Sequence, residues 1–194
     1  MNHSLRLACL APAFLLAGCI SFGPEPPESL LTLTPATMAP AGTTTSGDAG
    51  TALAMTEFDV PSALNVTRVP VQVTDTRIAY LQDAVWAEKP ARLLRRLIAE
   101  TIRARSGRLV IDGDDPGAMA EDRLTGTVRA FGYDARDGSV RLIFDAARPG
   151  EGSAVVTRRF EAVVPGIAPD AASVGPALNQ AANDVAGQVA EWVS

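Results

Sequence analysis

The clearest pattern in the chain is a helical one between Pro90 and Ser106, where apolar residues recur three and four positions apart. At 100° per residue this spacing places them on one helix face. Pro90 suits the first helical position because its ring presets φ and it has no N–H to leave unpaired. Gly107 suits the helix end, since glycine readily adopts a left-handed C-cap. The apolar face consists of Leu93, Leu94, Leu97, Ile98, Thr101 and Ala104, with Ala91 and Ile102 at its edge.

A second helical pattern runs from about Ser173 to Trp192. Its apolar face carries Val174, Leu178, Ala181, Ala182, Val185, Val189 and Trp192. Its polar face carries Asn179, Gln180, Asn183, Asp184 and Glu191. Such a division predicts a helix that lies on the surface of a core.

Between the two helices, alternating apolar and polar residues predict strands at 124–130, 140–144 and 154–164. The dipeptide Asp137-Gly138 is typical of a tight hairpin turn. Turn-forming residues at 149–152 separate the second strand from the third. These three strands are predicted to form an antiparallel meander.

Shorter apolar runs predict further strands at 29–33, 53–60, 65–73 and 108–111, and an extended segment from Arg77 towards Trp86. Trp86 is the natural large residue to pack where this segment meets the first helix. The order is then strands, helix, four strands and helix. This order predicts an α+β fold, a single domain at 29–194 with a mostly antiparallel sheet and two main helices packed on one side.

The first 18 residues have the pattern of a lipoprotein signal peptide. Leu7 to Ala17 is apolar apart from Pro12 and too short to span a bilayer. Small residues directly precede Cys19, which is what lipoprotein signal peptidase accepts, and the Cys19 sulfur would then carry a diacylglycerol. The alternative is an ordinary signal peptide with an incidental cysteine. The pattern predicts removal of residues 1–18 and lipid attachment at Cys19.

Two segments of low complexity follow this cysteine. Residues 19–28 include three prolines and predict an extended tether. Residues 34–51 are rich in Thr, Ala, Gly, Ser and Pro, with no core-forming periodicity. The second segment is either a loop after a first strand at 29–33 or the end of one long tether; the leucines at 29–33 favour the loop.

Charge and residue content exclude several classes of function. The net charge of −5 becomes more negative when Arg6 is removed with the signal peptide, which argues against nucleic acid as a partner. Removal of His3 and Cys9 leaves no histidine and, with Cys19 acylated, no free thiol. The commonest general base, most zinc sites and thiolate nucleophiles are thereby disfavoured. No phosphate-binding glycine loop accompanies Lys89, the only lysine. We therefore predict no catalytic residues, no metal and no cofactor.

An acidic segment between Asp112 and Asp122 resembles a calcium loop only in composition. With Asp112 at position one of the EF-hand pattern, Pro116 falls at position five and Arg123 at position twelve. The segment is expected to be a solvated loop.

Arg92, Arg96 and Arg103 fall on a narrow stripe of the first helix, opposite its apolar face, with Arg95 beside them. Guanidinium groups suit acidic partners or anionic head groups. The alternative is a solvated helix face supported by a pair between Arg96 and Glu100. These three arginines are the candidate partner-binding residues of the sequence.

The run RVPVQVTDTRIAYLQDAVWAEKPARLLRRLIAETI, from Arg68 to Ile102, resembles the central segment of the ABC-type transport auxiliary lipoproteins, the PqiC-like family. The matching features are the valine-rich strand after Arg68, Tyr80, Trp86 followed by Pro90, and the Leu-Leu pair that opens the helix. The resemblance implies a periplasmic lipoprotein that works with an MCE-type lipid transport system.

The function expected from this resemblance is that of a lipid-anchored accessory component without catalysis. Its partners would be the membrane, through the anchor, and the MCE-domain protein, permease and ATPase of an ABC transport system. Ile20 in place of aspartate after Cys19 favours the periplasmic face of the outer membrane. Two alternatives stay open: a cell-wall hydrolase with a carboxylate pair, and a direct lipid carrier with a closed apolar cavity lined by both helices and the sheet.

Overall fold

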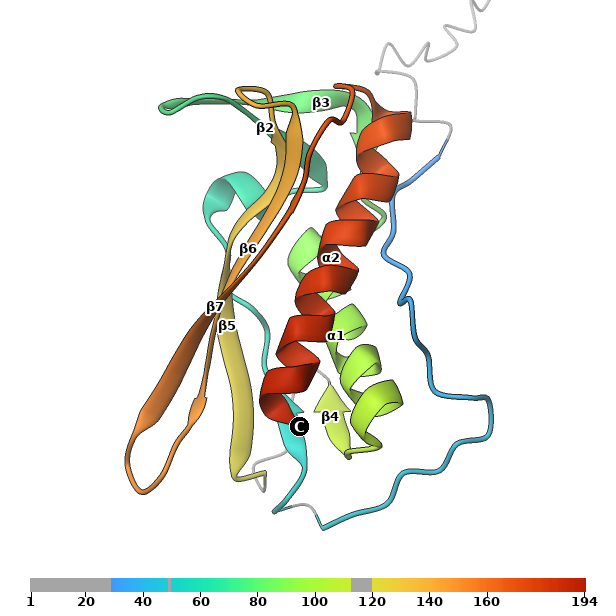
Figure 1. Cartoon of the computed structure of the whole chain (residues 1–194), viewed down its shortest axis with the longest axis vertical. Helices are drawn as coiled ribbons and strands as arrows, with labels where there is room; N and C mark the ends of the chain where they lie inside the picture. The colour runs from blue at the N-terminus through green and yellow to red at the C-terminus, as the bar shows by residue number, and fades with distance from the viewer. Residues whose placement is uncertain (1–28, 49, 113–119) are drawn as a thin grey trace, which may run out of the picture.

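The structure is a computed structural model that describes residues 29–48, 50–112 and 120–194. Two helices pack side by side on one side of a curled, seven-stranded sheet (Figure 1). One large core lies between the two layers, which confirms the predicted α+β class. The predicted signal peptide (1–18), Cys19 and the tether (19–28) lie outside the described residues. In the described parts of the chain, neither helix combines the length and apolar character needed to cross a membrane.

The long strands of the sheet form the predicted antiparallel meander of β5 (Asp122–Asp134), β6 (Ser139–Pro149) and β7 (Val155–Val164). The turn between β5 and β6 contains Gly138 at φ 67°, a left-handed conformation that suits glycine. One face of the meander points at the helices and is buried. It carries Leu124, Val128, Phe131, Val140, Leu142, Phe144 and Phe160.

Shorter strands join the meander partly by parallel pairing. β1 (Leu53–Met55) pairs in parallel with both β4 (Val110–Asp112) and β5. β2 (Arg68–Thr74) pairs in parallel with β5 and in antiparallel fashion with β3 (Arg77–Val85). The strand expected at 53–60 is thus shorter than predicted, and Asp59 adds only an isolated bridge. All three residues of β1 are buried, as is typical of a strand paired on both edges and covered on both faces.

The first helix, α1 (Pro90–Ser106), begins and ends as predicted, and Gly107 takes φ 64° at its C-cap. Leu94, Ile98 and Ile102 are fully buried on its apolar face. Arg95, which the helical pattern places beside the arginine stripe, is not on a solvated part of the helix. Arg95 is 3% exposed, and its guanidinium lies 3.0 Å from the carboxylate of Asp112 at the end of β4. The reason is that β4 follows α1 closely and packs against it, so this side of the helix meets a strand rather than water.

The second helix, α2 (Ala171–Val193), is slightly longer than predicted and buries the predicted apolar face. Asp170 caps its N-terminus, because its carboxylate accepts a hydrogen bond from the Ser173 N–H at 2.8 Å. Near the other end, Trp192 packs on Phe160 with a ring separation of 5.6 Å. Trp86 is buried against Phe131 at 5.3 Å, as expected for a residue between strand and helix.

Residues 29–48, called the strap below, run along the outer side of the helix layer (Figure 1). Leu31 forms one parallel bridge with Trp86, so the edge strand expected at 29–33 reduces to a single bridge. The strap then crosses both helices. Backbone N–H groups of Thr34 and Ala36 donate to the side-chain oxygens of Asn179 and Asn183 on α2, at 2.8 and 2.7 Å. The N–H of Ala39 donates to Glu100 on α1 at 2.9 Å.

Candidate docking surface

The polar side of α1 brings two of the three predicted partner-binding arginines to one place. Arg96 and Arg103 line a pocket of about 360 Å³ between α1 and the strap. Arg92 is half-buried and is not among the residues that line this pocket. The strap contributes Thr32, Leu33 and Pro35, and the acidic residues of the pocket are Glu88, Glu100 and Asp112.

The ion pairs of this surface differ from the expected pair between Arg96 and Glu100. Arg96 reaches back to Glu88 at 2.5 Å, and the Arg96 side chain remains 48% exposed. Glu100 lies 3.7 Å from Arg103 and also accepts the hydrogen bond of the strap. Arg103 donates to the carbonyl of Val110 at 3.0 Å. Glu100 and Arg103 therefore hold the strap and β4 in place, while Arg96 presents an exposed guanidinium at the rim.

Two carboxylates elsewhere have arginine partners that keep them ionised. Hydrogen bonds from Arg159, and then from Arg129, hold the pKa of Asp145 well below its ordinary value, at about 2. Hydrogen bonds from Arg136 lower the pKa of Asp134. A general acid needs the opposite shift, since it must carry a proton near neutral pH. Neither carboxylate suits that role. Among the described residues, moreover, no three Asp, Glu, His or Cys residues are grouped as metal ligands would be.

The two ends of the acidic segment are engaged in structural contacts. Asp112 pairs with Arg95, and one oxygen of Asp122 accepts from Arg108 at 2.7 Å and from Arg148 at 2.8 Å. The remainder of the segment, 113–119, lies outside the described residues.

The same two arginines cap the C-terminus of α2, a role that the sequence did not reveal. Arg108 donates to the carbonyl of Val193 at 3.0 Å, and Arg148 to that of Trp192 at 3.2 Å. Cations suit this end of a helix, where the carbonyl groups lack helical partners.

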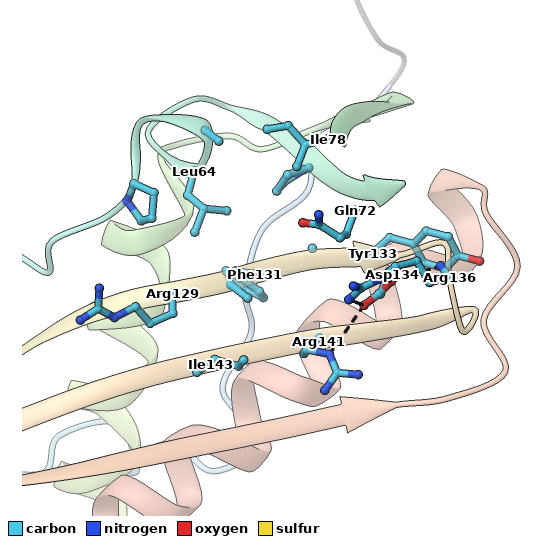
Figure 2. Close-up of a pocket in the computed structure, with 15 residues that line it drawn as sticks. Leu64, Gln72, Ile78, Arg129, Phe131, Tyr133, Asp134, Arg136, Arg141 and Ile143 are labelled. Atoms are coloured by element: carbon cyan, nitrogen blue, oxygen red, sulfur yellow. Dashed lines mark hydrogen bonds and ion pairs between the residues drawn. The ribbon is translucent and has the colours of Figure 1, made fainter. Parts of the chain in front are cut away.

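A second pocket, of about 280 Å³, lies on the sheet face that points away from the helices (Figure 2). Its floor is formed by β5 and β6, and its roof by β2, β3 and the short turn η1 (Ser62–Leu64). A carrier was expected to have a closed cavity between both helices and the sheet, and this pocket is placed differently.

A family model described as the ABC-type transport auxiliary lipoprotein component matches residues 31–190. No curated protein matches the chain. A crystal structure of a Xanthomonas campestris protein of family DUF330 has a TM-score of 0.69 at 18% identity, covering 84% of this chain and 93% of that one. The crystal structure of an uncharacterized protein has a TM-score of 0.64 at 14% identity, covering 86% and 100%. These likenesses confirm the fold, and the family match covers the segment whose resemblance was noted in the sequence. The chain belongs to the ABC-type transport auxiliary lipoprotein family.

Proposed function

We propose that this protein is a lipid-anchored accessory component of an MCE-type ABC transport system that moves lipids or other hydrophobic molecules between the envelope membranes. The family match over residues 31–190 is the observation that carries the proposal. Cys19 is the proposed acylation site, at the periplasmic face of the outer membrane. The partners are the MCE-domain protein, the permease and the ATPase of the same system.

The proposed mechanism is docking without catalysis. The lipid anchor confines the protein to one membrane surface, which raises its effective concentration near other envelope components. A modest interface is then sufficient for association. The ion-paired carboxylates of Asp134 and Asp145 are themselves unsuited to be the general acid of a hydrolase.

The proposed docking surface is the polar side of α1 beside the strap, with Arg92, Arg96 and Arg103. Arg96 carries most of the argument, because its guanidinium is exposed and its partner, Glu88, is a half-buried acid whose side chain still reaches solvent. An acidic partner can exchange with Glu88 at little cost, since exposed ion pairs are weak. Arginine also offers several donors in one plane to a carboxylate.

Affinity purification of the full lipoprotein from detergent-solubilised envelopes tests the function. We expect the MCE-domain protein, permease and ATPase to be recovered with it and identified by mass spectrometry. Recovery of none of the three would overturn the proposed membership in such a system.

Charge reversal tests the surface. Arg92→Glu with Arg96→Glu is expected to reduce recovery of these partners at least fivefold, by opposing an acidic surface. The control, Arg77→Glu with Arg158→Glu, makes the same change of charge at two exposed arginines on other elements and should retain recovery. Equal recovery with both double variants would mean that the partner docks elsewhere.

A further inference from the structure

The pocket on the outer sheet face exists because β2 covers only part of β5. β2 pairs with β5 only through Val71 and Gln72. Just before these residues Pro70 crosses closely over Gly132, and the preceding chain, with η1, lies above the sheet (Figure 2). Ala130 and Ile143, which face each other across β5 and β6, therefore remain beneath a roof rather than under a packed strand.

The pocket is apolar on its floor and on its roof. Ala130 and Ile143 form the floor, and Leu64, Pro61 and Pro70 lie in the roof. Ile78 of β3 lines the pocket while 48% exposed. Water makes few hydrogen bonds in such a lining, so an apolar occupant is favoured over water.

Three arginines lie at the edge of this apolar space, and each is paired with carboxylates. The lining includes three arginines, Arg129, Arg136 and Arg141. It includes a single carboxylate, that of Asp134. Asp134 is already bound by Arg136, whose Nε donates to it at 2.8 Å. Arg129 pairs with Asp145, which lies outside the lining. Arg141 pairs with Glu161 at 2.7 Å and Asp137 at 3.1 Å, both outside the lining, and lies 3.9 Å from Asp134 within it (Figure 2). The side chains of Arg129 and Arg141 remain 55% and 29% exposed. An anionic group at the mouth would reach these two guanidinium groups by exchanging with their carboxylates, at little cost because ion pairs with exposed members are weak.

We infer that this pocket binds a single-chain anionic amphiphile, with one acyl chain over Ala130 and Ile143 and its head group at Arg129 and Arg141. The volume supports one chain. A cavity of about 150 Å³ accepts benzene, whereas pockets for larger ligands span roughly 300–1,000 Å³, and this pocket measures about 280 Å³. Fatty acids and lysophospholipids share the required chemistry. The inference goes beyond the proposed docking function and does not depend on it.

Photolabelling of the full lipoprotein in nanodiscs of zwitterionic phospholipid tests the site. The probe is an undecanoate with a terminal diazirine, used below its critical micelle concentration. After irradiation, mass spectrometry of the digested protein should place adducts on peptides that contain Leu64, Ile78 and Ile143. Adducts spread over the strap or the helices instead would overturn the inference.

Two alanines on the outer face of the sheet provide a matched pair of variants. Ala130→Leu fills the pocket and is expected to reduce labelling at least tenfold. Ala147→Leu makes the same change on the same face, outside the lining, and should label as the wild type does. Equal labelling of both variants would rule the pocket out. Thermal melts followed by circular dichroism establish that both variants are folded.

The charge requirement has its own test. Arg129→Gln should lower labelling by the acid probe at least threefold and leave labelling by its methyl ester unchanged. Equal labelling of the wild type by acid and ester would overturn the anionic part of the inference.

Competition with dodecanoate and with lysophosphatidylglycerol distinguishes the two ligand sources. Failure of both compounds to reduce labelling would also overturn the inference. Partner recovery with Ala130→Leu should equal that of the wild type, so this test is separate from that of the proposed function.

Discussion

Gly132 determines how β2 crosses the meander. A Cβ at this position would lie 2.3 Å from the backbone oxygen of Pro70 and 2.9 Å from its ring. Pro70 itself has no N–H, so it contributes no donor to a ladder at the crossing. The close approach of the two backbones brings Val71 and Gln72 into register with Tyr133 and Asp134. The absence of one side chain thus permits the pairing of β2 with β5, which among the described residues is the strand pairing that joins the β2–β3 hairpin to the meander.

Gly132→Ala is therefore expected to lower the free energy of unfolding by about 2 kcal/mol or more, because the added methyl group meets backbone that cannot move independently. Gly47→Ala is the control. A Cβ there has only ordinary contacts, the nearest at 3.7 Å, and the change should stay below about 1 kcal/mol. Urea titrations of both variants measure the difference. Similar midpoints would show that the crossing relaxes at little cost.

Arg95 and Arg96 are neighbours in sequence with opposite environments. Arg95 is buried against Asp112, and Arg96 is exposed beside Glu88. A buried charge that loses its partner carries an uncompensated desolvation cost, whereas an exposed pair contributes little.

Arg95→Ala should lower the free energy of unfolding by about 3 kcal/mol, because it leaves Asp112 without its partner. Arg96→Ala should lower it by less than about 0.5 kcal/mol. Chemical denaturation of the two variants under one condition is sufficient for the comparison. The reverse order would mean that Arg96, not Arg95, points into the protein.

At the scale of elements, the strap is held by side chains of the helices that it crosses. Asn183 makes two of these contacts, since it accepts from the N–H of Ala36 and donates to the carbonyl of Thr34 at 3.0 Å. Leu31 adds an apolar contact, because its methyl group lies close above Gly175 of α2. The strap is thus part of the fold over residues 31–39.

Asn183→Ala should increase hydrogen exchange of the Ala36 amide several-fold by removing the acceptor of its hydrogen bond, with little effect on the meander. Gln180→Ala alters an exposed amide on the same helix and serves as the control. Unchanged exchange in Asn183→Ala would show that Leu31 and Leu33 alone hold the strap.

Asp145 links the three strands of the meander, because it lies on β6 and pairs with Arg129 of β5 and Arg159 of β7. Its folded-state pKa of about 2 is below the value of about 3.9 expected in the unfolded chain. The stabilisation is therefore present above about pH 4 and is lost as the pH falls towards 2. We expect the stability difference between wild type and Asp145→Asn to shrink over this range in urea melts. A difference independent of pH would contradict the assignment.

For the whole molecule, the elements with strong local periodicity could be predicted from the sequence, and those formed by distant contacts could not. α1, α2 and the meander follow from repeating apolar spacing. The strap has no such spacing, and the side-chain amides that bind Thr34, those of Asn179 and Asn183, lie 145 and 149 residues away on α2. The buried position of Arg95 likewise depends on β4, which follows α1 in the sequence and packs against it. Spacing on one helix cannot reveal a neighbour contributed by another element.

The anchor is a prediction about the whole molecule. Cys19→Ala should abolish incorporation of a radiolabelled fatty acid and leave the precursor uncleaved, because the modified sulfur is required before cleavage. Cys9→Ala, in the predicted signal peptide, should be labelled and cleaved as the wild type is. Incorporation that persists in Cys19→Ala would place the lipid elsewhere.

The bridge at Leu31 also determines which end of the folded domain a membrane anchor would hold close to the membrane. Two hydrogen bonds make this attachment, from the Leu31 N–H to Val85 at 2.7 Å and from the Ala87 N–H to Leu31 at 2.8 Å. The attachment lies towards the end of the molecule that carries the β2–β3 hairpin, and the β6–β7 hairpin projects at the other end (Figure 1). With Cys19 acylated as proposed, the folded domain would rotate about its attachment point at Leu31. The β6–β7 hairpin, at the end opposite the attachment, would then move over the largest distance. A component that approaches from the opposite membrane of the envelope would meet that hairpin first.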